Sequence, residues 1–171
     1  MAEWVIPILG SAVVLGIYDV FGAQDSNQET TIANILKNAD ALIAALRKDA
    51  PNAIIGVGLV TPGARTQDAF GANYANGQTR WQYKKNQHAL NAAMLKKFAA
   101  YPDKKVFIVP SCVNLDCENN FPSRKEAVNS SDSQGGKRTV IRQSNGVHPA
   151  PAGYNQMGDT FYCWIKYQLS K

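Results

Sequence analysis

One of the two histidines of this 171-residue chain lies on a stiff segment. His148 is part of "SNGVHPAPAGY", residues 144–154, where it follows the turn-forming pair Asn145-Gly146 and precedes two prolines. Turn chemistry on one side and fixed φ angles on the other leave the imidazole little conformational freedom. A general base needs such placement, within hydrogen-bond reach of the proton that it removes. The placement suits a general base, but on local chemistry alone the favoured interpretation is a histidine that caps the next helix or fills a surface niche.

Apolar runs that alternate with amphipathic segments predict strands alternating with helices. The apolar runs are rich in β-branched residues, as strands covered on both faces require. The strands are expected at residues 12–18, 53–61 and about 105–111, and the helices at about 26–50, 82–100 and 152–169. This order predicts a parallel sheet between helices, in which a ligand binds at the carboxyl ends of the strands.

Polar residues or glycines follow each expected strand. They occupy residues 16–19, 61–63 and 111–116, and His148 joins them from the loop before the last helix. A loop as long as 112–144, which includes a short strand-like segment at 138–142, usually serves a site or is mobile. We therefore expect a cleft at this edge of the sheet.

The composition fits one domain over residues 1–171, with 45% hydrophobic and 18% charged residues. The net charge is +5, but the 18 Lys and Arg residues are spread along the chain, so nucleic acid is not an expected partner. The apolar stretch 4–18 is short for a membrane span, so no membrane partner is expected either. Glu3 precedes it where a secretory signal has positive charge. We interpret the stretch as a buried strand, with a signal peptide as the alternative.

The three cysteines, Cys112, Cys117 and Cys163, do not have the spacing of metal ligands, so no metal site is expected. Because their number is odd, they cannot all pair within the chain. A disulfide between Cys112 and Cys117 is one alternative, and unreactive thiols are the favoured one. The cysteines therefore do not indicate whether the protein is found in an oxidising or a reducing compartment.

Two motifs resemble those of the SGNH (GDSL-type) hydrolases. "NGVHPAPAGY", residues 145–154, is similar to their C-terminal Asp-x-x-His-Pro block, which a helix follows. "LGIYDVFGAQD", residues 15–25, is similar to their Gly-x-Asn-Asp block at the end of a parallel strand. Residues 66–94 and 113–123 further resemble a subset common in phage and bacterial proteins. The similarity extends over nearly the whole chain, with the motifs in the family's order.

The resemblance implies a three-layer, flavodoxin-like α/β fold and a serine esterase that needs no metal or organic cofactor. The substrate would be a small ester or an acylated carbohydrate that loses an acetyl or similar acyl group. His148 matches the family's general base, and Asn145 matches the residue that orients it. The block that binds the oxyanion and substrate corresponds to Gly16, Tyr18 and Asp19. The resemblance is compatible with a soluble, secreted or phage-particle-associated protein.

The sequence departs from the family pattern at three places. Asn145 replaces the usual aspartate and offers no full charge to the imidazolium, which implies a dyad. Tyr18 stands in place of the oxyanion asparagine, and loss of one such donor costs about 3 kcal/mol of transition-state stabilisation. The Gly-Asp-Ser block that carries the nucleophile has no counterpart, so we expect the sheet to be N-terminally incomplete. Ser11, at the opening of the first strand, is a weak candidate nucleophile, and for Ser111 a structural role is favoured.

An incomplete sheet would leave the apolar edge of the 12–18 strand bare, and such an edge invites pairing with another chain. A homodimer, a complementing N-terminal fragment or residues 1–11 could cover it. The alternative function is a catalytically inactive binding or structural module. It would contact carbohydrate through aromatic residues of the polar loops, unless these pack beneath the loops: Phe70, Tyr74, Trp81 and Phe121.

Overall fold

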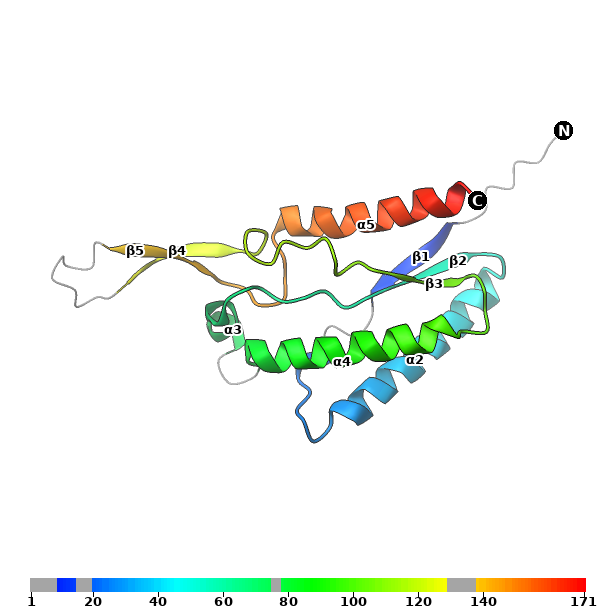
Figure 1. Ribbon diagram of the computed structural model, residues 1–171, viewed down its shortest axis with the longest axis horizontal. Coiled ribbons are helices and arrows are strands. Elements are labelled where there is room, and N and C mark those ends of the chain that lie inside the picture. The colour runs from blue at the N-terminus through cyan, green and yellow to red at the C-terminus, as the bar shows by residue number, and fades with distance from the viewer. Residues whose placement is uncertain (1–8, 15–19, 75–77, 129–137) are drawn as a thin grey trace.

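The chain forms a parallel sheet with helices on both faces, and a β-hairpin projects from one end (Figure 1). A computed structural model describes residues 9–14, 20–74, 78–128 and 138–171. The strands are β1 (Leu9–Val14), β2 (Ile54–Gly58), β3 (Val106–Val109), β4 (Ser123–Ala127) and β5 (Thr139–Gln143). The helices are α2 (Gln28–Asp49), α3 (Gln67–Tyr74), α4 (Arg80–Ala99) and α5 (Pro151–Leu169). The expected alternation of strands and helices is confirmed, and α3 and β4 are additional elements.

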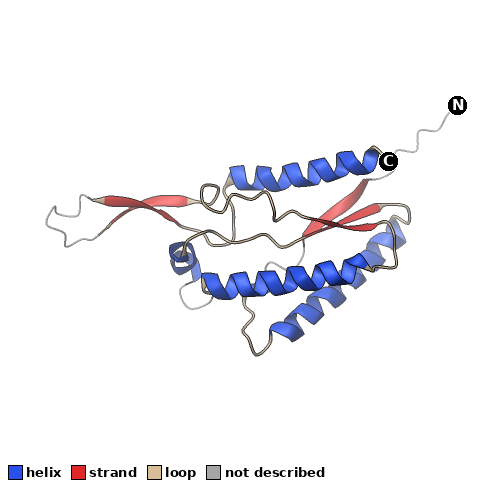
Figure 2. Ribbon diagram, in the orientation of Figure 1, coloured by secondary structure: helices blue, strands red, loops and turns tan. Residues whose placement is uncertain are grey.

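The strands β1, β2 and β3 lie side by side in that order and run parallel. Val57 of β2 pairs with Val13 of β1 and with Ile108 of β3. Helices α2 and α4 cover one face of the sheet, and α5 covers the other (Figures 1 and 2). The α/β class with a parallel sheet is therefore confirmed. The flavodoxin-like strand order and the incomplete N-terminal part stay predictions.

Apolar side chains fill the space between the sheet and the two helices on its first face. α2 contributes the stripe that its spacing predicts, and α4 contributes the residues opposite. The buried members include Ile35, Ala39, Ile43, Ile55, Val57, Leu90, Met94 and Phe98. On the other face, a Cβ added to Gly56 would lie 2.9 Å from the Trp164 ring, so glycine in the middle strand lets α5 pack closely.

Two expected strand boundaries are wrong. The first strand begins at Leu9 rather than at residue 12, and residues 15–18 of the expected span lie outside the described part. The second ends at Gly58 rather than at residue 61, because α4 side chains take over the hydrogen bonding. The Asn91 side chain accepts the Val60 N–H and donates to the Val60 carbonyl, both at 2.9 Å. An amide side chain thus replaces a neighbouring strand.

The long loop after β3 forms a hairpin, in which β4 and β5 pair antiparallel from Ser123 opposite Gln143 to Ala127 opposite Thr139. The hairpin extends beyond the layered body (Figure 1). The strand expected at residues 138–142 is confirmed as β5, with bounds shifted by one residue. Its partner escaped prediction because the β4 sequence, "SRKEA", is mostly charged and lacks β-branched residues.

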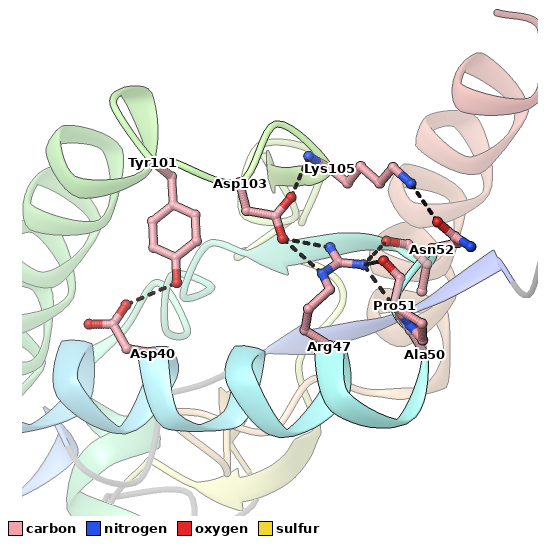
Figure 3. A network of polar contacts seen from close by, with 9 residues as sticks. Asp40, Arg47, Ala50, Pro51, Asn52, Tyr101, Asp103 and Lys105 are labelled. Atoms are coloured by element: carbon pink, nitrogen blue, oxygen red, sulfur yellow. Dashed lines mark hydrogen bonds and ion pairs between the residues drawn. The ribbon is translucent and has the colours of Figure 1, made fainter.

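A polar network fixes the end of α2 to the loops that precede β2 and β3 (Figure 3). The Arg47 guanidinium donates to the carbonyls of Ala50, Pro51 and Ala53 at 3.3, 2.9 and 2.7 Å. It also pairs with the Asp103 carboxylate at 2.7 Å. The backbone N–H of Lys105, followed by the Arg47 guanidinium, lowers the pKa of Asp103 below its usual value. The Arg47 side chain therefore holds together the loops at the amino ends of β2 and β3.

Replacement of Arg47 by alanine should lower the free energy of unfolding by about 1–3 kcal/mol, because partly buried carbonyls lose their donor. Urea titration measures the change. Lys48→Ala is the control, since Lys48 is the exposed neighbour on the same helix, and its effect should stay within about 0.5 kcal/mol. Equal effects of the two substitutions would contradict the role assigned to the network.

Candidate active site

The loop that carries His148 is shaped by the side chain of Asn145. The Oδ1 atom of Asn145 accepts the backbone N–H groups of Val147 and His148 at 3.1 and 2.9 Å. This local capping fixes the turn immediately before the imidazole. The described contacts of the oxygen that the resemblance assigns to orienting the imidazole are thus with the loop backbone.

The imidazole itself is half-buried and lies against the start of α5. Its Nδ1 atom is 3.4 Å from the hydroxyl of Tyr154, which is in the first turn of that helix. Sequence reasoning did not single out Tyr154 as a site residue, although it ends the motif that resembles the hydrolase block. The signal that could have found it is its place one helical turn beyond the proline-stiffened segment.

Hydrogen bonds hold the His148 loop against the segments that leave the carboxyl ends of β2 and β3. Ala64, beyond β2, donates its N–H to the Gly146 carbonyl at 2.9 Å. Ala150 donates to the carbonyl of Asn120, beyond β3, at 2.9 Å. The loop that carries the histidine therefore contacts the segments that follow two of the three strands.

Two glycines allow this approach. A Cβ on Gly63 would lie 2.7 Å from the Gly146 carbonyl oxygen, and a Cβ on Gly146 would lie 2.9 Å from the ring of Phe70. Phe70 is fully buried and belongs to α3, the helix that the sequence did not predict. The Phe70 ring therefore packs beneath the segment around Gly63 and beneath the His148 loop.

Gln143 connects the hairpin to the segments that follow β2 and β3. Its Oε1 accepts the N–H and the hydroxyl of Thr66 at 2.9 and 3.1 Å. Its Nε2 donates to the carbonyls of Cys117 and Glu118 at 2.8 and 3.0 Å. Because Gln143 is the last residue of β5 and is buried, it fixes where the strand enters the His148 loop.

The predicted oxyanion and substrate residues, Gly16, Tyr18 and Asp19, lie outside the described residues. The segment directly after them is anchored by Asn86 of α4. The fully buried Asn86 amide donates to the carbonyls of Val20 and Ala23 at 3.0 and 2.8 Å.

The two candidate serines occupy different environments. Ser11 lies within β1, three residues before its last residue, which places it about 10 Å from that end of the strand. Ser111 is fully buried and donates its hydroxyl to the Leu59 carbonyl at 2.7 Å. The structural role favoured for Ser111 agrees with this contact, whereas Ser11 as a nucleophile stays a prediction.

A pocket of about 190 Å³ opens between the segment after β2 and the start of α4. Its apolar base includes Phe70 and Tyr83, which are fully buried, and basic residues line it as well: Arg65, Arg80 and Lys84. Burial raises the pKa of Tyr83 well above its usual value. Burial is also the main cause of the raised pKa of the Cys117 thiol, which lines the same pocket, so the thiol is protonated at neutral pH.

The cysteines and aromatic residues of the loops can now be placed. All three cysteines are unpaired, so the alternative of a Cys112–Cys117 disulfide is not realised. No cluster of three or more metal-ligating side chains occurs within the described ranges. Phe70 and Phe121 are buried and Tyr74 is half-buried, whereas the Trp81 side chain is 70% exposed.

No protein-family model and no curated protein matches the sequence. Among solved structures, the chain is similar to a Streptococcus pneumoniae protein provisionally described as a platelet activating factor. The TM-score is 0.58 and the sequence identity 17%. The similarity covers 90% of this chain but 58% of that protein. At this identity the match shows a shared α/β fold and nothing about activity. Separately, none of the described helices has the length and apolar character needed to cross a membrane.

Gly146→Ala should lower the free energy of unfolding by about 1–3 kcal/mol, because the added methyl group meets the buried Phe70 ring. Gly158→Ala makes the same change on α5 where nothing lies within 4 Å, and it should stabilise the helix by up to about 1 kcal/mol. Urea unfolding of both variants measures the difference. If Gly146→Ala left the free energy of unfolding unchanged, the close approach of the two loops would not be needed for stability.

Proposed function

We propose that this chain is an SGNH-type acyl hydrolase in which His148 is the general base. The observation that carries the proposal is the hydrogen bonding of the His148 loop to segments at the carboxyl ends of parallel strands. This is where α/β folds of this kind bind their ligands. The similarity in fold to an SGNH-like hydrolase supports the same assignment.

The proposed chemistry is general-base catalysis of ester cleavage. The imidazole of His148 takes the proton of an attacking hydroxyl group while that oxygen bonds to the ester carbonyl. The protonated imidazole then gives the proton to the leaving alcohol oxygen, and water finally releases the acid. A positioned base contributes roughly 10²–10⁴-fold to such a rate. The substrate class, a small ester or acylated carbohydrate, follows from the sequence resemblance.

Ser11 as the attacking hydroxyl, and Gly16, Tyr18 and Asp19 as groups at the oxyanion, belong to the proposal. The segment 20–23 supports the second assignment, because Asn86 anchors the backbone immediately after these residues. Asn145 contributes by holding the backbone on which the imidazole is mounted.

His148→Ala should lower the rate of p-nitrophenyl acetate hydrolysis by about 10²-fold or more, because the base is removed. His88→Ala is the matched control: His88 is the other histidine of the chain, is exposed on α4, and should leave the rate unchanged. Initial rates measured against buffer give both values. An equal fall in the two variants would mean that the ester is cleaved by unspecific imidazoles, and the proposal would fail.

Ser11→Ala in the same assay tests the nucleophile. If the Ser11 hydroxyl attacks the ester, the variant loses as much activity as His148→Ala, since the two groups act as a unit. Mass spectrometry of the wild-type chain after rapid quenching should then show an acetyl group on the peptide that contains Ser11. Retained activity would exclude this serine.

A carbohydrate-binding module without catalysis is the second candidate, favoured by the exposed Trp81 side chain. Absence of ester hydrolysis above buffer by the wild-type chain, together with carbohydrate binding, would support it.

The proposal for partners concerns the edge of the sheet. Within the described part, β1 pairs only with β2, so its other side is the place for a second copy or an N-terminal fragment. Size-exclusion chromatography with light scattering tests the homodimer.

A further inference from the structure

We propose that the pocket between the segment after β2 and the start of α4 binds a negatively charged group of a sugar, with Trp81 against the sugar ring. The inference rests on the proposed function for the substrate being an acylated sugar. It adds that this sugar is anionic, a uronate or a sugar phosphate. Binding of such a sugar can be measured without ester cleavage.

The pocket has positive charge that no described carboxylate balances. Arg65 pairs with Glu118, and both side chains are largely exposed. By contrast, no carboxylate among the described residues pairs with Arg80 or Lys84, which also line the pocket. A carboxylate or phosphate placed there would therefore find charged donors that no protein group has neutralised.

Lys85, the residue after Lys84, does have a carboxylate partner. Lys85 pairs with Asp25 at 2.8 Å, on a part of the helix surface that does not line the pocket. Among the three cations of the first two turns of α4, the two without a described carboxylate partner are therefore the two that line the pocket. This difference also supplies a control substitution that removes a positive charge from the same helix outside the pocket.

Trp81 supplies an apolar surface beside the same cations. Its side chain is 70% exposed. The Arg80 guanidinium carbon and the Lys84 ammonium lie 5.4 and 5.6 Å from the indole centroid. Cations at this distance interact with the ring, so the three side chains form one surface. An exposed tryptophan beside cations suits a ligand with an apolar ring face and a negative charge.

The size of the pocket sets how much of the ligand it holds. Its volume of about 190 Å³ is below the roughly 300–1,000 Å³ of sites that enclose a whole small molecule. The buried rings of Phe70 and Tyr83 form its base, and Gln87 adds a polar group. The pocket therefore suits one charged substituent, with the rest of the sugar outside it over Trp81.

The pocket is physically connected to the histidine loop. Gly63 and Ala64 line it, and the Ala64 N–H bonds to the carbonyl of Gly146, two residues before His148. A sugar anchored by its charge would thus lie beside the segment that positions the proposed base. Recognition of the charged group and placement of the ester use the same stretch of backbone.

Calorimetric titration with three ligands tests the proposal: D-glucuronate, D-glucose 6-phosphate and D-glucose. The wild-type chain should bind at least one of the two anionic sugars about tenfold or more tightly than glucose, because charge-assisted hydrogen bonds are lost with the neutral sugar. The ligand that binds distinguishes a uronate from a phosphate. The preference should weaken as NaCl is raised.

The double variant Arg80→Gln, Lys84→Gln should lose this preference, whereas Lys85→Gln should retain it. The double variant removes no ion pair, and the change at Arg80 removes a cation from the positive end of α4, so the fold should persist. Circular dichroism and thermal unfolding verify this.

Equal binding of glucose and both anionic sugars by the wild type, or an unchanged preference in the double variant, would overturn the proposal. Anion binding without any ester hydrolysis would refute the hydrolase function while the anionic subsite stands. Hydrolysis that depends on His148 but shows no preference for anionic sugars would do the reverse. The two failures are therefore distinguishable.

Discussion

The contact between the Ala64 N–H and the Gly146 carbonyl is the constraint on which the candidate site depends. The chain leaves the sheet after β3, runs out along the hairpin and returns through β5, so the His148 loop has no covalent reason to lie near β2. A single hydrogen bond contributes only about 1 kcal/mol net. The glycines at positions 63 and 146 matter more, since they let the two backbones meet over the buried Phe70 ring. Close packing makes this one arrangement stable.

Buried amide side chains perform the same task elsewhere around the site. Asn86 holds the segment that follows residues 16–19, Asn91 holds the continuation of β2, and Gln143 holds the base of the hairpin. Each amide satisfies backbone groups that no strand reaches, which would otherwise be costly to bury. The loops beyond the sheet are therefore held in place by side-chain hydrogen bonds, although they have irregular backbone. Such a scaffold suits a site that must place a proton acceptor accurately.

Elements that local sequence patterns determine could be predicted from the sequence. Elements that depend on contacts between distant segments could not. The α2 stripe has three- and four-residue steps, so its buried face at Ile35, Ala39 and Ile43 was predictable. Helix α3 has only eight residues and contains a glycine, and it is stabilised by burial of Ala69 and Phe70 rather than by its own propensity. The stiff mount of His148 is local and was identified. The Tyr154 contact and the basic pocket join separate segments, so no spacing revealed them.

Charge is distributed differently at the two ends of the sheet. At the amino end, Arg47 is matched by Asp103 and by three carbonyls, so its charge serves the fold. At the carboxyl end, Arg80 and Lys84 face a pocket without a described carboxylate, and the positive end of α4 lies beside Arg80. Cations in that position repel the helix dipole and cost stability rather than add to it. A bound ligand of opposite charge would offset this cost, and the neighbouring histidine loop is where the proposed substrate would react.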